Sequence, residues 1–443
     1  MKSIGKSFLK YVLTFVIVIL LFIATLIISS LFPRDWIEEN TLESATTLLQ
    51  EGNPNYVLDM KLDNYTDALM INTAYSINPS KPFESAMLAR KNYLLEKEQT
   101  VYPDSNGGLI SSADGDYDIL GELYKTVRHD ISESYEYARY WHGYLIILRP
   151  LLIFFNISQI KVIIGILLAL LAFYLFMMLS KKIPIKFCYI IILALAFSDF
   201  FLMGITLQGV LTFVISMVAS IIIYERYDKI KNISMYFMVI GMVTCFFDLL
   251  THPIITLGIP ITVYLLLKQE KEHTGLKENI KLIIVNSIMW GIGYLLTNLT
   301  KWILVDVFYR RNLINIAFEQ FLFRSQAASV SDPKFLGEAV IYNFEQAGIR
   351  VYLFFAVIFI YVIAYLIRNY KVMKFNVKAG VPYLIISLMP IAWYLLMNNH
   401  DVDHSYFTYR GLVVFYIGVG LFLLKLLDNN PASEDGEKTR LEK

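Results

Sequence analysis

Two acidic residues four positions apart, Asp63 and Asp67, have a spacing that could support chemistry. On a helix this spacing places both side chains on one face. Two adjacent carboxylates raise the pKa of one of them, which suits a general base, or they bind a hard divalent cation. The structural alternative is an Asp that caps a helix start, with the second Asp on a solvated face. The spacing alone leaves both interpretations open.

A denser polar cluster lies near the C-terminal end of the chain, in the run NNHDVDHSYFTYR. Here His400 and His404 are four positions apart with Asp401 and Asp403 between them, a pattern that could bind a metal ion of unknown type. Arg410 follows about one turn inside an apolar run, where its charge needs a partner such as a phosphate oxygen. Because a soluble loop needs no arginine at that depth, the pattern favours a binding site over a solvated turn.

Polar residues also precede and interrupt the apolar stretch at 144–155. Arg139 and His142 are three positions apart and could face a shared anion in a substrate pocket. Arg149 lies inside the stretch, where a buried arginine is costly unless it is paired. We expect 144–155 to form a helix in the outer membrane interface, with Arg149 turned toward headgroups or phosphate. Snorkelling of the side chain without a ligand is the alternative.

A further acidic residue and histidine, Asp248 and His252, are four positions apart at the end of another apolar stretch. A carboxylate within a membrane segment is a candidate functional group. The two side chains could contact a substrate, or they could pair with each other and close a helix before Pro253. The sequence favours neither interpretation.

The composition identifies the kind of protein that must position these residues. The 443 residues are 56% hydrophobic and have a mean hydropathy of +0.52, which predicts a multi-pass membrane protein associated with the lipid bilayer. A net charge of +1 gives no basic field for a nucleic-acid partner. The two cysteines, Cys188 and Cys245, both lie in apolar stretches, so they form no disulfide framework.

Hydropathy predicts an all-α polytopic membrane protein with about ten transmembrane helices and a large first extracytoplasmic loop that contains interfacial helices. The apolar stretches lie at 9–32, 160–180, 185–204, 206–224, 232–251, 253–267, 280–300, 351–367, 379–397 and 406–426. The second extracytoplasmic segment is expected at 301–350, and its arginines could bind phosphate or lie on a solvated face.

Short connections rich in Lys and Arg orient these spans. They lie near 2–10, 181–186, 226–231, 268–281, 368–378 and 425–443, and with ten spans all of them fall on one side of the membrane. The positive-inside rule therefore predicts that both termini are cytoplasmic and that the 33–143 insertion lies outside. The richness in Ile, Lys, Asn and Tyr is typical of an AT-rich bacterial genome, which favours the plasma membrane as the location. The predicted parts are 1–32, 33–159, 160–300, 301–350, 351–427 and a cytoplasmic tail at 428–443.

The cytoplasmic connections are too short for a nucleotide-binding domain, and the chain contains neither of the glycine-rich phosphate-binding patterns. Any chemistry is therefore expected to use substrates that are presented outside the cell or within the lipid.

In its architecture the chain resembles the C-type (GT-C) membrane glycosyltransferases: one span, a large acidic first outer loop with interfacial helices, and then many spans. The resemblance implies a compact bacterial enzyme that moves a sugar from a polyprenyl-phosphate carrier to an extracytoplasmic glycan, lipid or protein. It would give the role of base or metal ligand to Asp63 or Asp67, and it would place Arg410, Arg149 and the His400–His404 turn near the donor phosphate. The paired acidic residues that many members carry near the start of this loop are missing here, since Asp35 is followed by Trp36.

Two other functions fit the same pattern. A flippase or transporter of a lipid-linked glycan would show inverted repeats and charges at mid-membrane, and the chain has no clear internal repeat. In a non-catalytic protein of cell-envelope assembly, the outer polar residues would not converge on a cavity.

Overall fold

The computed structural model describes residues 2–53, 55–57, 60–93, 101–103, 109–111, 118–131, 133–272, 274–325, 335–369 and 375–427. The predicted cytoplasmic tail at 428–443 lies outside these residues. Helices dominate the described chain, and its strands form three short antiparallel pairs, β1–β2, β3–β6 and β4–β5. The protein is therefore a mainly α-helical membrane protein, as the hydropathy predicts.

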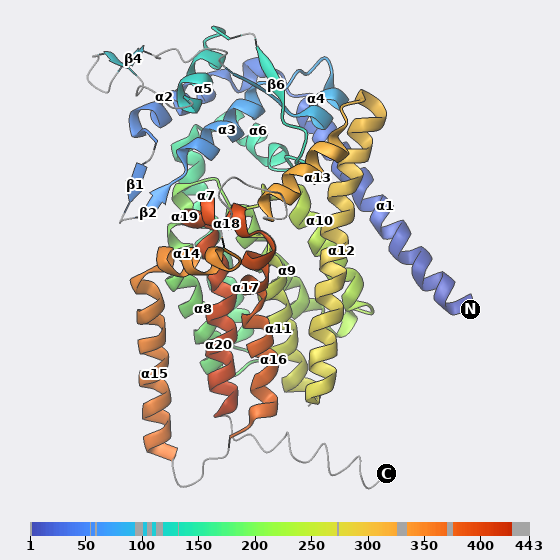
Figure 1. Ribbon diagram of the computed structural model, residues 1–443, viewed down its shortest axis with the longest axis vertical. Helices are drawn as coiled ribbons and strands as arrows, with labels where there is room; N and C mark the ends of the chain where they lie inside the picture. The colour runs from blue at the N-terminus through green and yellow to red at the C-terminus, as the bar shows by residue number, and fades with distance from the viewer. Residues whose placement is uncertain are drawn as a thin grey trace.

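Residues 33–155, named the cap segment here, cover one end of the molecule (Figure 1). Its elements are short because polar and turn-forming residues interrupt the apolar periodicity every few positions. The helices are α2 (Glu38–Glu51), α3 (Asn64–Tyr75), α4 (Pro82–Leu88), α5 (Ile119–Val127) and α6 (Leu145–Phe154). The strands are β1 (Asn55–Val57), β2 (Met60–Leu62), β3 (Arg90–Asn92), β4 (Val101–Pro103), β5 (Leu109–Ser111) and β6 (Ser134–Glu136).

Long helices form the rest of the molecule, and helices occupy all ten of the apolar stretches. A bilayer core of about 30 Å needs about 20 helical residues. Among the described residues, seven helical runs are long and apolar enough to cross a membrane: 6–30, 157–179, 210–229, 276–309, 349–369, 377–396 and 405–426. The main helices are α1 (Lys2–Ser30), α7 (Ile157–Leu179), α8 (Ile185–Phe197), α9 (Val210–Arg226), α10 (Ile233–Phe247), α11 (Ile255–Glu272), α12 (Leu276–Tyr309), α15 (Ile349–Asn369), α16 (Val377–Ser387), α17 (Met389–Leu396) and α20 (Leu412–Leu426).

Two of the apolar stretches are broken where the sequence interrupts the helix. After α8, Asp199 adopts a left-handed conformation, with a φ of 55°, and a 3-10 helix (Phe200–Ile205) takes the rest of that stretch. Pro390 at the start of α17 separates α17 from α16, because proline cannot supply the backbone N–H that a continuous helix needs.

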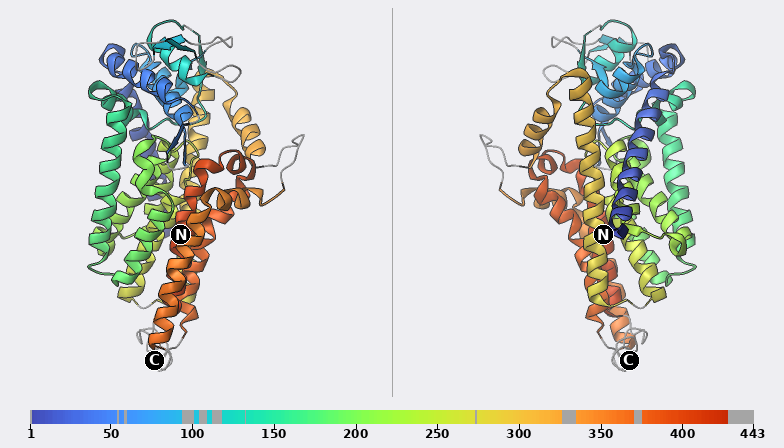
Figure 2. Two further views of the ribbon diagram at one scale, coloured as in Figure 1. Left: turned by 90° about the vertical axis from the view of Figure 1, so that its left-hand side faces the viewer. Right: turned by 90° about the vertical axis from the view of Figure 1, so that its right-hand side faces the viewer.

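Short helices at the capped end join the long ones. They are α13 (Leu313–Arg324), α14 (Glu338–Ala347), α18 (Asn398–Asp403) and α19 (Ser405–Thr408). The predicted helices of the second outer segment are therefore present, and they lie with α18 on one side of the molecule (Figure 2).

Hydrogen bonds fasten the cap segment to the bundle, mainly along α12. The indole N–H of Trp141 donates to the carbonyl of Thr297 at 2.9 Å. A second hydrogen bond has its donor in the bundle: the buried ammonium of Lys301 in α12 donates to the carbonyl of Ala86 in the cap segment at 2.8 Å. Because unpaired polar groups are costly to bury, these contacts fix the position of the cap segment on the bundle.

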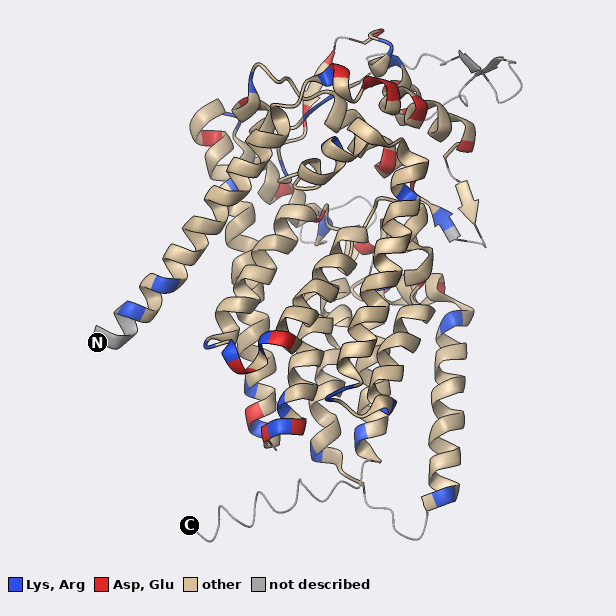
Figure 3. Ribbon diagram, turned by 180° about the vertical axis from the view of Figure 1, so that it is seen from behind, with Lys and Arg blue, Asp and Glu red and all other residues tan. Residues whose placement is uncertain are grey.

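Charged residues are divided between the two ends of the molecule. Figure 3 shows Lys and Arg, with some acidic residues, in the short connections at the end opposite the cap segment; charged residues of both signs also lie at the capped end, and the basic N-terminal stretch lies part-way along the molecule. All twelve candidate site residues lie instead in the cap segment or in connections and helix ends (Figure 1). The positive-inside rule uses the Lys and Arg residues of these short connections to predict that this end of the molecule faces the cytoplasm.

Candidate functional site

Asp63 lies at the N-terminus of α3, directly after the β1–β2 hairpin. Its carboxylate accepts hydrogen bonds from the backbone N–H of Thr66, at 3.1 Å, and from the Thr66 hydroxyl. The hydroxyl of Tyr406 lies close enough to this carboxylate for the two groups to interact electrostatically, and the nearby Lys61 ammonium lies 4.3 Å from the centre of the Tyr406 ring. The predicted capping role is therefore confirmed, and the same carboxylate contacts a residue of a distant segment.

The Asp63 carboxyl is buried, and burial shifts its pKa. Only 5% of the residue is exposed, and burial raises the pKa of this carboxyl above its ordinary value, with a smaller contribution from nearby Asp67. The hydrogen bonds from Thr66 act in the opposite direction.

Asp67 is fully buried and has different partners. One of its oxygens lies 3.1 Å from the ammonium of Lys161 in α7, and the other accepts the backbone N–H of Leu207 at 2.9 Å. The two carboxylates are therefore neighbours along α3, but only Asp63 contacts the C-terminal turn, a name used here for residues 398–410.

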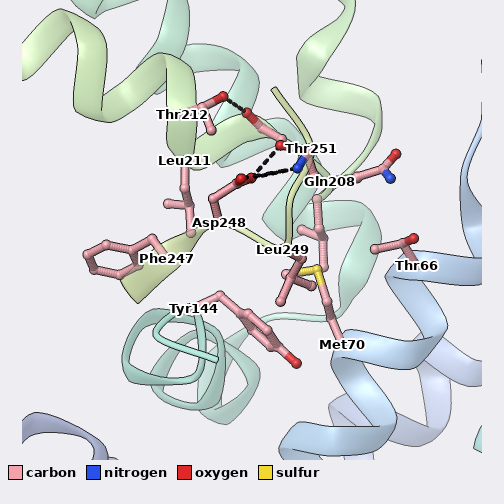
Figure 4. A pocket seen from close by; sticks show the side chains of 12 residues that line it. Thr66, Met70, Tyr144, Gln208, Leu211, Thr212, Phe247, Asp248, Leu249 and Thr251 are labelled. Carbon is pink, nitrogen blue, oxygen red and sulfur yellow. Dashed lines mark hydrogen bonds between the residues drawn. The ribbon is translucent and has the colours of Figure 1, made fainter. Parts of the chain in front are cut away.

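A small pocket lies beside α3, between the cap segment and the bundle (Figure 4). Its cavity volume is about 20 Å³, which is room for about one water molecule. Figure 4 shows side chains from four segments around it: Thr66 and Met70 from α3; Tyr144 before α6; Gln208, Leu211 and Thr212 before and in the first turn of α9; and Phe247, Asp248, Leu249 and Thr251 at the end of α10 and after it.

Asp248 and His252, which could have paired with each other, bind other groups. The Asp248 carboxylate accepts the backbone N–H of Thr251 at 3.1 Å, together with the Thr251 hydroxyl (Figure 4). His252 lies 3.2 Å from the carbonyl of Gly209. Burial and the nearby charge of Arg410 lower the pKa of His252 to about 3, so its ring is neutral.

The C-terminal turn contacts the 248–252 loop through His400. One ring nitrogen of His400 lies 2.8 Å from the carbonyl of Leu250, and the other lies 3.4 Å from the guanidinium of Arg324. Its ring centroid is 4.5 Å from that of His404, which stacks on Phe407. Within the described residues, no three His, Cys, Asp or Glu side chains are grouped as a metal site would require.

The two acidic residues of this turn differ sharply in environment. Asp401 is fully buried, and neither of its carboxylate oxygens has a hydrogen-bond partner in the described chain. Burial raises its pKa well above the ordinary value, although Arg324 opposes this shift. Asp403, in contrast, is exposed.

Arg410 is buried at the start of the last membrane helix, with 3% of the residue exposed. Its guanidinium carbon lies 4.9 Å from the centre of the Tyr409 ring. The Tyr409 hydroxyl donates to Asp199, which also accepts from Arg350 at 2.8 Å. Asp199 and Lys161 were not among the predicted site residues, although charged residues in apolar stretches are candidates by default.

Arg149 differs from its predicted position. It is fully buried, not turned toward headgroups, and donates to the carbonyls of Ser29, Phe32 and Ala74. The physical reason is that carbonyls at helix C-termini lack intrahelical donors. A guanidinium with five N–H groups can satisfy several of them at once.

The spacing of Arg139 and His142 would allow them to face a shared anion. In the structure each of the two side chains binds a different protein group. Arg139 donates to the side chain of Gln320 at 2.8 Å. His142 lies 2.7 Å from the carbonyl of Tyr137 and 3.1 Å from the Tyr144 hydroxyl. Burial lowers the pKa of His142 to about 3, so this ring is neutral.

Segments far apart in the sequence thus converge at the capped end: α3, the start of α9, the 248–252 loop and the C-terminal turn. Asp63 is joined to the C-terminal turn through Tyr406, and His400 joins the same turn to the 248–252 loop. No protein-family model, curated protein or solved structure matches the chain.

Proposed function

We propose that the protein is a membrane glycosyltransferase of the GT-C type, which moves a sugar from a polyprenyl-phosphate carrier to an acceptor at the outer face of the membrane. The contact between Asp63 and Tyr406 carries this proposal. It places a buried carboxylate of raised pKa beside the turn that holds His400, His404 and Arg410. The proposal includes a plasma-membrane location with both termini in the cytoplasm.

Asp63 is the general base in this proposal. It takes the proton of the acceptor hydroxyl while that oxygen attacks the anomeric carbon of the donor sugar. The bond between the anomeric carbon and the phosphate oxygen breaks, and the phosphate leaves with the electron pair. Attack from the side opposite the leaving group inverts the anomeric centre. A carboxyl with a raised pKa is a better proton acceptor than an ordinary Asp.

Arg410 binds the donor phosphate, with His400 and His404 of the same turn as further candidates for this role. A cation in a poorly hydrated site stabilises the charge that develops on the leaving phosphate, and one such contact contributes about 3 kcal/mol. Arg149 has no role here because three carbonyls occupy its donors. The pocket beside α3 has polar and aromatic groups in its lining, and it must widen from its room for about one water molecule to admit a sugar ring.

Transfer from lipid-linked sugars by membranes that contain Asp63→Asn tests this proposal. Asp118→Asn is the matched control, because Asp118 caps α5 in the same way, by accepting the backbone N–H of Gly121 at 2.8 Å. We expect Asp63→Asn to lower the transfer rate by about 100-fold or more, as loss of a general base does, and Asp118→Asn to leave it largely intact. Undiminished transfer by Asp63→Asn would exclude the proposed base. Translocation of the lipid-linked sugar without any transfer would identify a flippase instead.

A further inference from the structure

A buried ion pair joins the cap segment to the bundle next to the pocket. Asp67 of α3 is fully buried, and the Lys161 ammonium 3.1 Å away comes from α7. Glu51, at the end of α2, lies 3.8 Å from the same ammonium and accepts the side-chain amide of Asn64 at 3.1 Å. Three helices therefore meet at one cation.

The remaining oxygen of Asp67 binds the loop that forms one wall of the pocket. It accepts the backbone N–H of Leu207 at 2.9 Å and the hydroxyl of Thr206 at 3.3 Å. The Thr206 hydroxyl also accepts the backbone N–H of Gln208 at 3.2 Å. Leu207, Gln208 and Gly209 line the pocket, as do the neighbours of Asp67 on α3, Thr66 and Met70.

Two further contacts keep residues 206–209, named the 206–209 loop here, in this position. At Gly204 a Cβ would lie 2.7 Å from the Cα of Gly165 in α7, so the lack of side chains lets the chain approach α7 one turn after Lys161. At Gly209, whose φ is 71°, a Cβ would lie 2.2 Å from the His252 ring. The loop is therefore packed at both ends, and Asp67 binds its centre.

We infer that Asp67 is a positioning residue: with Lys161 it holds the 206–209 loop as a wall of the pocket and does not itself exchange a proton with the substrate. The structural part of this inference is independent of the reaction. Its kinetic consequence rests on the proposed transferase function, in which the pocket holds the donor sugar or the acceptor.

Thiol labelling of the loop tests the structural part without any assay of activity. Gln208→Cys, in a chain with Cys188→Ala and Cys245→Ala, is labelled with a water-soluble maleimide; Gln208 is only 7% exposed, so the parent reacts slowly. Lys161→Met leaves the buried Asp67 carboxylate without its partner, and Asp67→Asn leaves the Lys161 ammonium only the more distant Glu51, 3.8 Å away. Each is expected to raise the labelling rate by about 5-fold or more. In the double variant both charges are gone and the amide oxygen can still accept from Leu207, so the rate should return to within about 2-fold of the parent.

Glu122→Gln is the matched control. It breaks another buried pair of the cap segment, in which Lys91 lies 3.0 Å from Glu122, and it should leave the labelling of residue 208 unchanged. If a single variant does not fold, Thr206→Val loosens the same loop with both charges in place and should raise the labelling rate by about 2-fold or more.

Kinetics of the double variant separate positioning from catalysis. If Asp67 is a positioning residue, adding Lys161→Met should restore most of the transfer activity lost in Asp67→Asn, and the remaining loss should appear in KM. The loss of a catalytic base could not be rescued in this way. Unchanged labelling of residue 208 in the single variants and in Thr206→Val would overturn the inference, as would a double variant with restored labelling and no transfer. Full transfer by Asp63→Asn would overturn the proposed function alone and leave the labelling result intact.

Discussion

At the scale of single residues, Asp63 combines a structural contact with a reactive position. Its carboxylate caps α3 through Thr66 and also meets the hydroxyl of Tyr406. Burial opposes ionisation of this carboxyl and the cap favours it, and burial is the larger effect. The raised pKa that results has consequences for the pH dependence of the proposed reaction.

We predict that transfer is lost on acidification at a pH above 3.8, the ordinary value for Asp. A protonated Asp63 cannot accept the hydroxyl proton, so the rate falls as the pH drops through the raised pKa. The pH dependence of stability runs in the opposite direction, because the pKa of this carboxyl is higher in the folded than in the unfolded protein. Its contribution to the free energy of unfolding is fully present below pH 3.8 and is lost as the pH rises through the raised pKa. A profile of kcat/KM against pH tests the first effect. A midpoint at or below 3.8 would contradict it.

Replacement of Arg149 should destabilise the protein and spare any binding of phosphate. Arg149→Met leaves the carbonyls of Ser29, Phe32 and Ala74 without their donor. The free energy of unfolding should fall by roughly 3 to 5 kcal/mol, and Arg149→Lys should restore only part of it because an ammonium lacks the planar fork. Thermal unfolding in detergent measures the change. If Arg149→Met is as stable as the parent protein but no longer binds the donor, Arg149 is a donor-binding residue and not a structural one.

At the scale of elements, sequence and structure agree where hydropathy decides the outcome. Helices lie in all ten apolar stretches, because apolar runs can satisfy their backbone in lipid only as helices. Seven helical runs of the described residues are long and apolar enough to cross a membrane, so the count of ten spans stays a prediction. The partners of the site residues could not be predicted in this way. Nothing in the spacing of Arg149 or His142 shows that backbone carbonyls bind them, and nothing near Asp67 points to Lys161 about 90 residues later.

Gly209 offers a test at the scale of a connecting element. Its φ is 71°, and a Cβ at this position would lie 2.2 Å from the His252 ring, so there is no room for a side chain. Gly209→Ala should therefore reduce stability by roughly 1 to 3 kcal/mol and weaken substrate binding at the pocket. Gly275→Ala is the control, since a Cβ there would meet no atom within 4 Å. Equal stability of the two variants would show that the loop between the 3-10 helix and α9 is not held as described.

At the scale of the whole molecule, the cap segment and the basic connections occupy opposite ends (Figures 1 and 3). The cap segment covers the bundle and contributes Asp63 to the site, while the C-terminal turn contributes the histidines and Arg410. The proposed reaction requires that this end face the outside, where no nucleotide is available and a lipid-linked donor supplies the activated bond.

This sidedness predicts the labelling of intact cells. Tyr56→Cys, at a residue that is 60% exposed in the cap segment, should react with a membrane-impermeant maleimide. Lys229→Cys, in the connection between α9 and α10, should react only after the cells are opened. The native Cys188 and Cys245 are buried and give little background. The opposite pattern would place the capped end in the cytoplasm.

The central claim is that the cap segment and the C-terminal turn form one site. Cross-linking of Lys61→Cys to Tyr406→Cys in native membranes tests it most directly, because the Lys61 ammonium lies 4.3 Å from the centre of the Tyr406 ring. We predict efficient cross-linking of this pair by a short bifunctional thiol reagent, and none for Lys61→Cys with Lys182→Cys, which lies between α7 and α8. Failure of the first pair to cross-link, with both cysteines reactive toward single maleimides, would contradict the shared site.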